Sequence, residues 1–148
     1  MNMSNKLRTF TILLVEDNPG DVRLTKEAFK EGRLDVEIYD VSDGIEALEF
    51  LEKQNSFSEA PRPDLILLDL NLPRKNGREV LSIIKNNKKL KQIPVVILTT
   101  SSAESDIIES YNSFANCYIT KPINMDEFIE VAKEIERFWL TTVQLPIN

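Results

Sequence analysis

Carboxylic acids stand directly after two apolar runs of the chain. Glu16 and Asp17 follow the run from Thr11 to Val15, and Asp69 follows the run from Leu65 to Leu68. Continuous apolar runs of this length favour strands that are covered on both faces, as in a parallel sheet. Open parallel sheets bind their ligands just beyond the carboxyl ends of the strands. The three acids are therefore candidates for a reactive or ligand-binding site, although Asp69 taken alone could equally cap a turn.

Hydroxyl and ammonium groups stand at two further strand ends. Thr99 and Thr100 end the apolar run that begins at Pro94, and Lys121 follows the short run at residues 117–120. Crossovers between parallel strands are right-handed, so the strand ends all point the same way. We therefore expect these groups to lie at one edge of the sheet, together with the acids.

Three carboxylates in one crevice favour a bound cation. Each like-charge pair about 4 Å apart costs on the order of 1–4 kcal/mol in wet surroundings. The chain has no histidine and only one cysteine, and a site with oxygen ligands favours Mg²⁺ or a similar hard ion. A lysine and a hydroxyl opposite the metal would complete a clamp for a phosphoryl group. An aspartate beside them could act as the nucleophile and form an aspartyl phosphate.

Strand and helix patterns alternate along the chain and would position these groups. Strands are predicted at residues 11–15, 36–41, 65–68, 94–100 and 117–120. Helices are predicted at about residues 21–31, 43–53, 77–85, 107–114 and 125–139. This alternation is typical of an α/β fold in which helices cover both faces of a parallel sheet. The length of 148 residues favours a single domain, residues 1–148.

Composition excludes several classes of function. The net charge of −6 argues against nucleic-acid binding, which needs a basic face. The one basic cluster, Lys85 to Lys91, is interpreted as a solvated helix end. No apolar run approaches the ~20 residues of a membrane span, and the N-terminus has no signal-peptide pattern. The single cysteine, Cys117, excludes an internal disulfide, fits a reducing cytoplasm and is expected to pack in a strand. The lack of histidine removes histidine-based acid–base catalysis and the common zinc sites.

Over residues 11–137 the chain resembles a receiver domain of a two-component response regulator. The resemblance rests on Leu-Val-Glu-Asp-Asn at 14–18, Leu-Leu-Asp-Leu-Asn-Leu-Pro at 67–73 with Gly77, Thr99, and Tyr-Ile-Thr-Lys-Pro at 118–122. It implies a flavodoxin-like doubly wound sheet of five parallel strands in the order 2-1-3-4-5, with five helices. It also implies a cytoplasmic phosphorelay protein that takes its phosphoryl group from a sensor histidine kinase. Such a protein is no enzyme beyond its own phosphorylation and dephosphorylation.

The resemblance assigns a phosphoacceptor and a metal site. It implies that Asp69 accepts the phosphoryl group. Asp17 and Asp69 would bind Mg²⁺ together with the backbone carbonyl of Asn71, and Glu16 would act through a metal-bound water. Glu16 stands where Asp is commoner in the family, which is expected to alter the affinity for the metal.

The resemblance also implies a conformational switch around the phosphoryl group. Thr99 and Lys121 would contact the phosphoryl oxygens, and the Tyr118 ring would change rotamer together with Thr99. The peptide bond between Lys121 and Pro122 would be cis. Thr100 stands where a small Ala or Gly is usual, so access to the phosphoryl group is expected to be narrower.

A narrower resemblance comes from two segments, Asn-Pro-Gly-Asp-Val-Arg-Leu-Thr at 18–25 and Leu-Pro-Arg-Lys-Asn-Gly-Arg-Glu-Val-Leu at 72–81. They resemble the small response regulators that partner cyanobacterial and other bacterial phytochrome histidine kinases. Residues 138–148 form a C-terminal extension that is too short for a helix-turn-helix output domain. The output is therefore expected to be an interaction that the receiver itself makes.

The C-terminal helix and extension predict a homodimer. The helix from Met125 is expected to use its apolar residues up to Ile135 for its own core. Phe138, Trp139, Leu140 and the apolar residues that follow would remain for a second copy. The alternative is that the extension folds back over its own subunit.

Two other functions remain open. A phosphohydrolase with an aspartate nucleophile usually has a second Asp two residues on, where this chain has Asn71. A flavodoxin-like flavin binder would need a hydroxyl- and glycine-rich phosphate loop after the first strand, where this chain carries acids.

Overall fold

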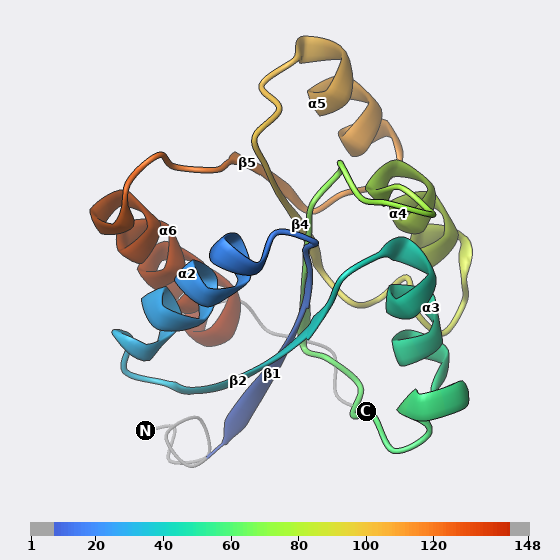
Figure 1. Cartoon of the computed structure of the whole chain (residues 1–148), viewed down its shortest axis with the longest axis horizontal. Helices are drawn as coiled ribbons and strands as arrows, with labels where there is room; N and C mark the ends of the chain where they lie inside the picture. Colours follow the sequence, from blue (N-terminus) through green and yellow to red (C-terminus); the bar gives the residue numbers. More distant parts are fainter. Residues whose placement is uncertain (1–7, 143–148) are drawn as a thin grey trace.

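A five-stranded parallel sheet runs through the centre of the molecule, and helices cover both of its faces (Figure 1). The computed structural model describes residues 8–142. The strands are β1 (Thr9–Val15), β2 (Asp35–Val41), β3 (Leu65–Leu68), β4 (Val95–Thr99) and β5 (Cys117–Thr120). Their order across the sheet is β2-β1-β3-β4-β5, with every neighbouring pair parallel. The fold class and the strand order expected from the sequence are confirmed.

The described residues contain five α-helices, as the resemblance implies. These are α2 (Pro19–Lys30), α3 (Gly44–Glu52), α4 (Gly77–Asn86), α5 (Glu104–Asn112) and α6 (Met125–Arg137). Helices α2 and α6 lie against each other on one face of the sheet, while α3 and α4 cover the other (Figure 1). A 3₁₀ turn at Asn55–Phe57 and a π-helical turn at Phe138–Thr142 follow α3 and α6. No helix within residues 8–142 is long and apolar enough to cross a membrane.

Side-chain caps fix where the loops at the carboxyl edge become helices. Asn18, Asp43, Asn76 and Asn124 each accept a backbone N–H from the first turn of the helix that follows, which satisfies a donor that has no partner within the helix. Helix α5 begins after Ala103 without such a cap. The loop that leaves β4 is instead tied to α5 by Ser101, whose hydroxyl donates to Oδ2 of Asp106 at 2.7 Å.

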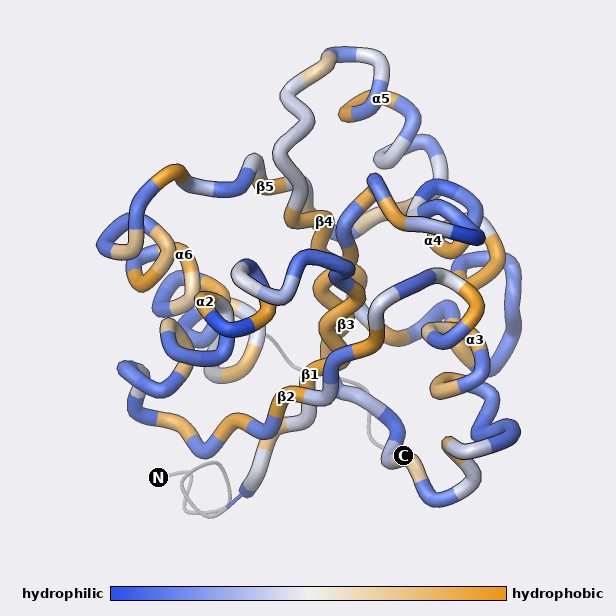
Figure 2. Tube along the Cα trace, in the orientation of Figure 1, coloured by the Kyte–Doolittle hydropathy of each residue, from blue (hydrophilic) through white to orange (hydrophobic). Residues whose placement is uncertain are grey.

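Strand β3 is the most deeply buried of the five strands. All four of its side chains are fully buried. Leu65 and Leu67 pack towards α2 and α6, and Ile66 and Leu68 pack towards α3 and α4. Figure 2 shows the apolar strands at the centre and polar residues on the outer parts of the helices. The run of four apolar residues therefore delivers Asp69 from a strand that is covered on both faces, as expected.

Two surface features differ from simple amphipathic packing. Helix α5 exposes apolar side chains: Ile108 within the helix is 57% exposed, and Phe114, shortly after the end of the helix, is 73% exposed. In the C-terminal extension, Leu140 is buried and Trp139 is half-buried against the α2 and α6 side of the core. The expectation that Leu140 is left for a second copy is therefore wrong, because the chain folds back at this point. Phe138 stays 52% exposed, and residues 143–148 lie outside the described residues.

Lys85 also departs from its interpretation as part of a solvated helix end. Its ammonium donates hydrogen bonds to the carbonyls of Lys91 (3.0 Å) and Ile93 (2.9 Å) and to Oδ1 of Asn116 (3.0 Å). Burial lowers the pKa of Lys85 to about 8. Lys85 therefore joins the end of α4 to the loops before β4 and β5, and this role requires contacts that no local pattern predicts.

Candidate functional site

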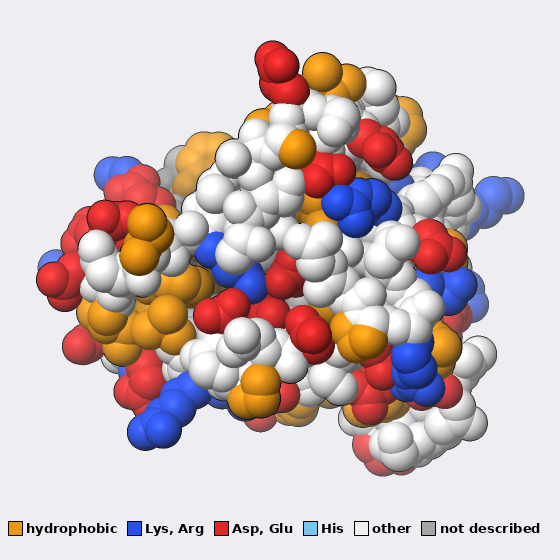
Figure 3. Space-filling model, turned by 45° about the horizontal axis from the view of Figure 1, so that its top comes forward, with side chains coloured by type: hydrophobic (Ala, Val, Ile, Leu, Met, Phe, Trp, Pro, Cys, Tyr) orange, Lys and Arg blue, Asp and Glu red, His pale blue; other side chains and the backbone are white. Residues whose placement is uncertain are grey.

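Backbone hydrogen bonds continue past the strand ends and align the residues that follow them. The N–H of Asp69 donates to the carbonyl of Val15 at 3.1 Å. The N–H of Lys121 donates to the carbonyl of Thr99 at 2.7 Å. The polar residues therefore leave the sheet at one common edge, as the parallel topology predicts. On the face formed by the loops at this edge, acidic side chains gather in the middle with basic side chains beside them (Figure 3).

The Lys121 ammonium lies at the centre of this cluster. It donates hydrogen bonds to a carboxylate oxygen of Glu16, to Oδ2 of Asp21 at 2.8 Å and to Oδ2 of Asp69 at 2.9 Å. The side chains of Lys121, Glu16 and Asp69 are 6%, 4% and 8% exposed. Ions this deeply buried are tolerated only where they are paired, and here the three donors of the ammonium meet three carboxylates.

Asp69 receives further hydrogen bonds on its other oxygen. The Thr99 hydroxyl donates to Oδ1 of Asp69 at 2.9 Å, and the backbone N–H of Asn71 donates to the same atom at 3.0 Å. Thr99 is fully buried, and Thr100 beside it is exposed. A hydroxyl and an ammonium thus converge on one carboxylate, and these two groups can stabilise negative charge that develops on a group attached to it.

Three carboxylates of this site could hold a metal ion. Glu16, Asp17 and Asp69 each offer an oxygen, and the three oxygens lie within 4.8 Å of one another. Asp17 is exposed, so a metal could be reached from solvent. An all-oxygen donor set fits a hard divalent cation such as Mg²⁺ or Mn²⁺.

Burial and charge shift the pKa values of the central pair. Burial raises the pKa of Glu16 to about 7, although the hydrogen bond from Lys121 acts in the opposite direction. Burial would lower the pKa of Lys121, but its hydrogen bonds to Asp21, Glu16 and Asp69 outweigh burial and raise it above the value of a free lysine. Lys121 therefore stays charged at neutral pH, and Glu16 is the group whose charge changes there.

This shift predicts how stability depends on pH when no divalent metal is bound. The folded chain holds the Glu16 proton more tightly than the unfolded chain, since the pKa rises from 4.5 to about 7. The stability that this proton contributes is fully present below about pH 4.5 and is lost as the pH rises through 7. Wild type should therefore lose on the order of 2–3 kcal/mol of unfolding free energy relative to Glu16→Gln between pH 5 and pH 8.

Urea unfolding of the two proteins in EDTA at several pH values measures this difference. Mg²⁺ binds the ionised carboxylates, so added Mg²⁺ should restore the stability of wild type at pH 8 more than at pH 5. Parallel pH profiles for wild type and Glu16→Gln would contradict the expectation.

Gly77 allows the loop after β3 to pass close to Asp69. A Cβ atom at this position would lie 2.1 Å from the backbone carbonyl oxygen of Asp69 and 2.7 Å from Cα of Leu70. The N–H of Gly77 donates to the carbonyl of Leu70 at 2.9 Å, which closes the loop. Any side chain here would displace the backbone that carries Asp69, which explains why the motif needs a glycine.

The loop after β5 differs from expectation in one respect. The peptide bond between Lys121 and Pro122 is trans, since the described residues contain no cis peptide. The expectation of a cis bond is therefore wrong, and trans is also the intrinsically preferred form of such bonds. The trans backbone still brings the Lys121 side chain to the carboxylates.

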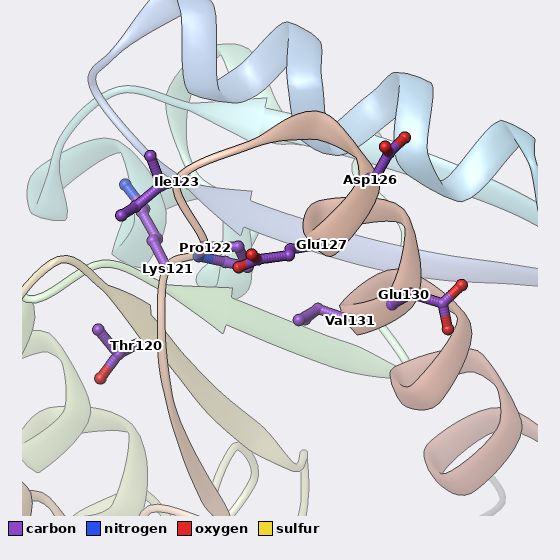
Figure 4. Close-up of a pocket in the computed structure, with 8 residues that line it drawn as sticks. All are labelled: Thr120, Lys121, Pro122, Ile123, Asp126, Glu127, Glu130 and Val131. Carbon is purple, nitrogen blue, oxygen red and sulfur yellow. The ribbon is translucent and has the colours of Figure 1, made fainter.

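A pocket of about 640 Å³ lies next to this loop, between β5 and α6. Figure 4 shows that the amine of Lys121 points away from the acidic side chains of Asp126 and Glu130, which line the same pocket. The ammonium therefore belongs to the carboxylate cluster and leaves this pocket to the apolar and acidic side chains around it.

The predicted switch residues lie on neighbouring strands. Tyr118 is half-buried on β5, and its hydroxyl donates to the carbonyl of Ser101 at 3.0 Å. Thr99, at the end of β4, directs its hydroxyl to Asp69. Thr99 thus contacts the carboxylate site, and the loop that begins after it contacts the tyrosine.

Sequence reasoning missed Asp21. It was assigned only to the start of a helix, yet its carboxylate reaches Lys121, which is 100 positions further along the chain. The available signal was its place in the first turn of the helix after β1, three residues beyond the cap Asn18. An acid at that position lies over the carboxyl edge of the sheet.

A doubly wound parallel sheet with acids, a hydroxyl and a lysine at its carboxyl edge is the arrangement that the receiver motifs imply. Residues 12–133 match the family model of the response regulator receiver domain. The chain is 52% identical to the response regulator Rcp1 of Synechocystis over 135 residues, which cover 91% of this chain and 92% of Rcp1. It is 38% identical to a probable methanogenesis regulatory protein, FilR2 of Methanothrix harundinacea, over 88% of this chain and 84% of that protein.

Solved structures show the same similarity. The phosphorylated cyanobacterial phytochrome response regulator RcpA superposes with a TM-score of 0.90 at 49% identity, over 95% of this chain and 100% of RcpA. The Mn²⁺-bound form of Rcp1 superposes with a TM-score of 0.87 at 51% identity, over 93% of this chain and 99% of Rcp1. The chain belongs to the response regulator receiver domain family, which is a signalling family.

Proposed function

We propose that this chain is a stand-alone response regulator that accepts a phosphoryl group on Asp69 from a histidine kinase. The observation that carries the proposal is the convergence of Lys121 and Thr99 on the buried Asp69 carboxylate, at 2.9 Å each. The similarity to this chain covers 92% of Rcp1 and 100% of RcpA, so the receiver makes up nearly all of these two relatives. Its chemistry is confined to its own phosphorylation and dephosphorylation.

The residues around Asp69 have separate parts in this reaction. A carboxylate oxygen of Asp69 attacks the phosphorus of the phosphohistidine, and the bond from phosphorus to the histidine nitrogen breaks. Asp17, Asp69 and the backbone carbonyl of Asn71 would hold Mg²⁺, with Glu16 acting through a metal-bound water. A bound Mg²⁺ supplies neutralisation of the phosphoryl charge. The Thr99 hydroxyl and the Lys121 ammonium stabilise the phosphoryl oxygens once the group is transferred.

The direct test uses acetyl phosphate as a small phosphoryl donor. Incubation of the chain with acetyl phosphate and Mg²⁺ should raise its mass by one phosphoryl group, and excess EDTA should prevent the increase. The Mn²⁺-bound form of Rcp1 indicates that a second divalent ion should be included in the titration. Full labelling in EDTA would refute the metal requirement, and no labelling with any divalent ion would refute the proposed function.

The partner we propose is a cytoplasmic histidine kinase of the phytochrome class. One matched protein supports this partner, because RcpA is a cyanobacterial phytochrome response regulator and shares 49% of aligned residues with this chain. The residues at 18–25 and 72–81 point the same way. The enzymatic alternative is a phosphohydrolase with Asp69 as nucleophile. Such enzymes usually have a second Asp two residues after the nucleophile, and this chain has Asn71 there.

The signal would be carried by Thr99 and Tyr118. In the phosphorylated state the Thr99 hydroxyl is drawn to a phosphoryl oxygen, and the Tyr118 ring turns inward into the space that the threonine and its loop vacate. Such a shift needs contacts that differ between the two states. The hydrogen bond from the Tyr118 hydroxyl to the Ser101 carbonyl is the contact that would stabilise the unphosphorylated state.

Crystal structures with and without beryllofluoride, a phosphoryl mimic, test this switch. The Tyr118 hydroxyl should leave the Ser101 carbonyl only in the form that carries the mimic. A Tyr118 ring in the same position in both structures would count against the switch.

We propose a homodimer through the C-terminal helix and extension, in which exposed Phe138 is a central contact. Phe138 is 52% exposed and lies edge-on to the Trp139 ring at 5.3 Å, and exposed aromatic residues of this kind are enriched at interfaces. Removal of the whole extension would also remove buried Leu140, so a single substitution is the cleaner test.

Sedimentation equilibrium at micromolar concentration should give about twice the chain mass of 17.0 kDa for wild type. Phe138→Glu should reduce the mass to one chain. Ile123→Glu, at a 98% exposed site in the loop before α6, serves as the matched control and should remain dimeric. A monomeric wild type in both phosphorylation states would rule the dimer out.

A further inference from the structure

The carboxylate of Asp21 is a fourth acid at the site, and it takes one of the three donors of Lys121. Its Oδ2 lies 2.8 Å from Nζ of Lys121, as close as Oδ2 of Asp69 at 2.9 Å. Glu16 accepts the third donor. No donor of the ammonium therefore remains for a newly attached group unless one of these three contacts is given up.

Asp21 is held in place by its helix rather than by a strand end. Its backbone N–H donates to Oδ1 of the cap Asn18 at 3.0 Å, and its carbonyl accepts the Thr25 hydroxyl at 2.7 Å. Thr25 itself is buried, and α2 packs along α6. The Asp21 side chain is 29% exposed, compared with 4% for Glu16. Asp21 is thus a firmly anchored but partly hydrated anion whose contact with Lys121 is the easiest of the three to exchange.

The charges of the site show that the contact between Asp21 and Lys121 opposes the addition of a negative group to Asp69. Glu16, Asp17, Asp21 and Asp69 face a single ammonium. A divalent metal would bring the cluster close to neutrality, and a phosphoryl group on Asp69 would add one more negative charge. Asp21 then repels the added charge and also draws Lys121 away from it.

We propose that Asp21 is a positioning residue that acts through Lys121 and weakens the phosphorylated state. This inference rests on the proposed function and adds to it a residue that sets how strongly the site holds the phosphoryl group. When Asp69 carries that group, Lys121 must release Asp21 to contact a phosphoryl oxygen. The cost of this exchange, together with the repulsion from Asp21, lowers the affinity of the site for the added anion.

Binding of beryllofluoride in saturating Mg²⁺ measures this effect as an equilibrium. Calorimetry first gives the Mg²⁺ affinity of each protein, so that all variants are compared with the metal site filled. Asp21→Asn should bind beryllofluoride roughly three- to tenfold more tightly than wild type, as expected for removing a like charge about 6 Å away in wet surroundings. Asp21→Ala, which also removes the acceptor atom, should show the same sign.

The control is Glu27→Gln, which removes one negative charge from the exposed face of the same helix, where Glu27 pairs with Lys30 at 3.6 Å. It should bind beryllofluoride as wild type does. A merely structural role for Asp21 predicts weaker binding in both Asp21 variants, so tighter binding separates the two explanations. Unchanged or weaker binding by a folded Asp21→Asn, judged by circular dichroism, would overturn the inference. No binding by wild type would instead overturn the proposed function and this inference with it.

Discussion

The Asp69→Asn variant should take up no phosphoryl group from acetyl phosphate under conditions that label the wild-type chain completely. The amide of asparagine is not a nucleophile at neutral pH, whereas the carboxylate is. The substitution keeps the shape of the side chain and an acceptor for the Thr99 hydroxyl, so loss of labelling would report the chemistry rather than unfolding. Intact mass spectrometry in Mg²⁺ gives the readout.

A matched control is available on β2, which β1 separates from β3. Asp40 stands one residue before the end of β2, is exposed and pairs with Lys26 at 2.5 Å. Asp40→Asn makes the same chemical change near the same edge of the sheet and should be labelled as wild type is. Equal labelling of the Asp69 and Asp40 variants would show that Asp69 is not the phosphoryl acceptor.

The parts of this site that could be predicted from the sequence are those that follow strand ends. The four apolar residues before Asp69 predict a buried strand, and the structure buries all four. The short strand before Lys121 is likewise predicted from its sequence. In a parallel sheet every strand ends at the same edge, so a one-dimensional pattern suffices to bring such residues together. The caps Asn18 and Asn124 were equally local signals.

The parts that could not be predicted depend on how distant elements are oriented. Asp21 meets Lys121 only because the lysine side chain extends from the end of β5 to the first turn of α2, and no periodicity in either segment contains that information. Lys85 finds three acceptors on two separate loops. On α5 the apolar residues mark a helix correctly but do not reveal that Ile108 is mostly exposed.

Replacing Lys121 should have the second largest effect, on stability as well as on phosphoryl transfer. Lys121→Met keeps the length of the side chain but removes the charge that Glu16, Asp21 and Asp69 share. Breaking a buried ion pair by removing one partner costs about 3–5 kcal/mol, because the remaining charges are buried without compensation. We expect a loss of that size in the free energy of unfolding at pH 8 in EDTA, together with much slower labelling by acetyl phosphate.

The dependence on pH and metal distinguishes this mechanism from a simple packing defect. At pH 5 Glu16 can hold a proton, because burial raises its pKa to about 7, so the loss should be smaller there than at pH 8. Mg²⁺ should recover part of the stability at pH 8, since it replaces the missing positive charge. Lys26→Met is the matched control, because Lys26 pairs with Asp40 at the surface, where both side chains are 39% exposed and such pairs contribute about 0–1 kcal/mol. If Lys121→Met lost no more stability than Lys26→Met, or lost the same amount at every pH, the buried ammonium would not be what holds the carboxylates of this site together.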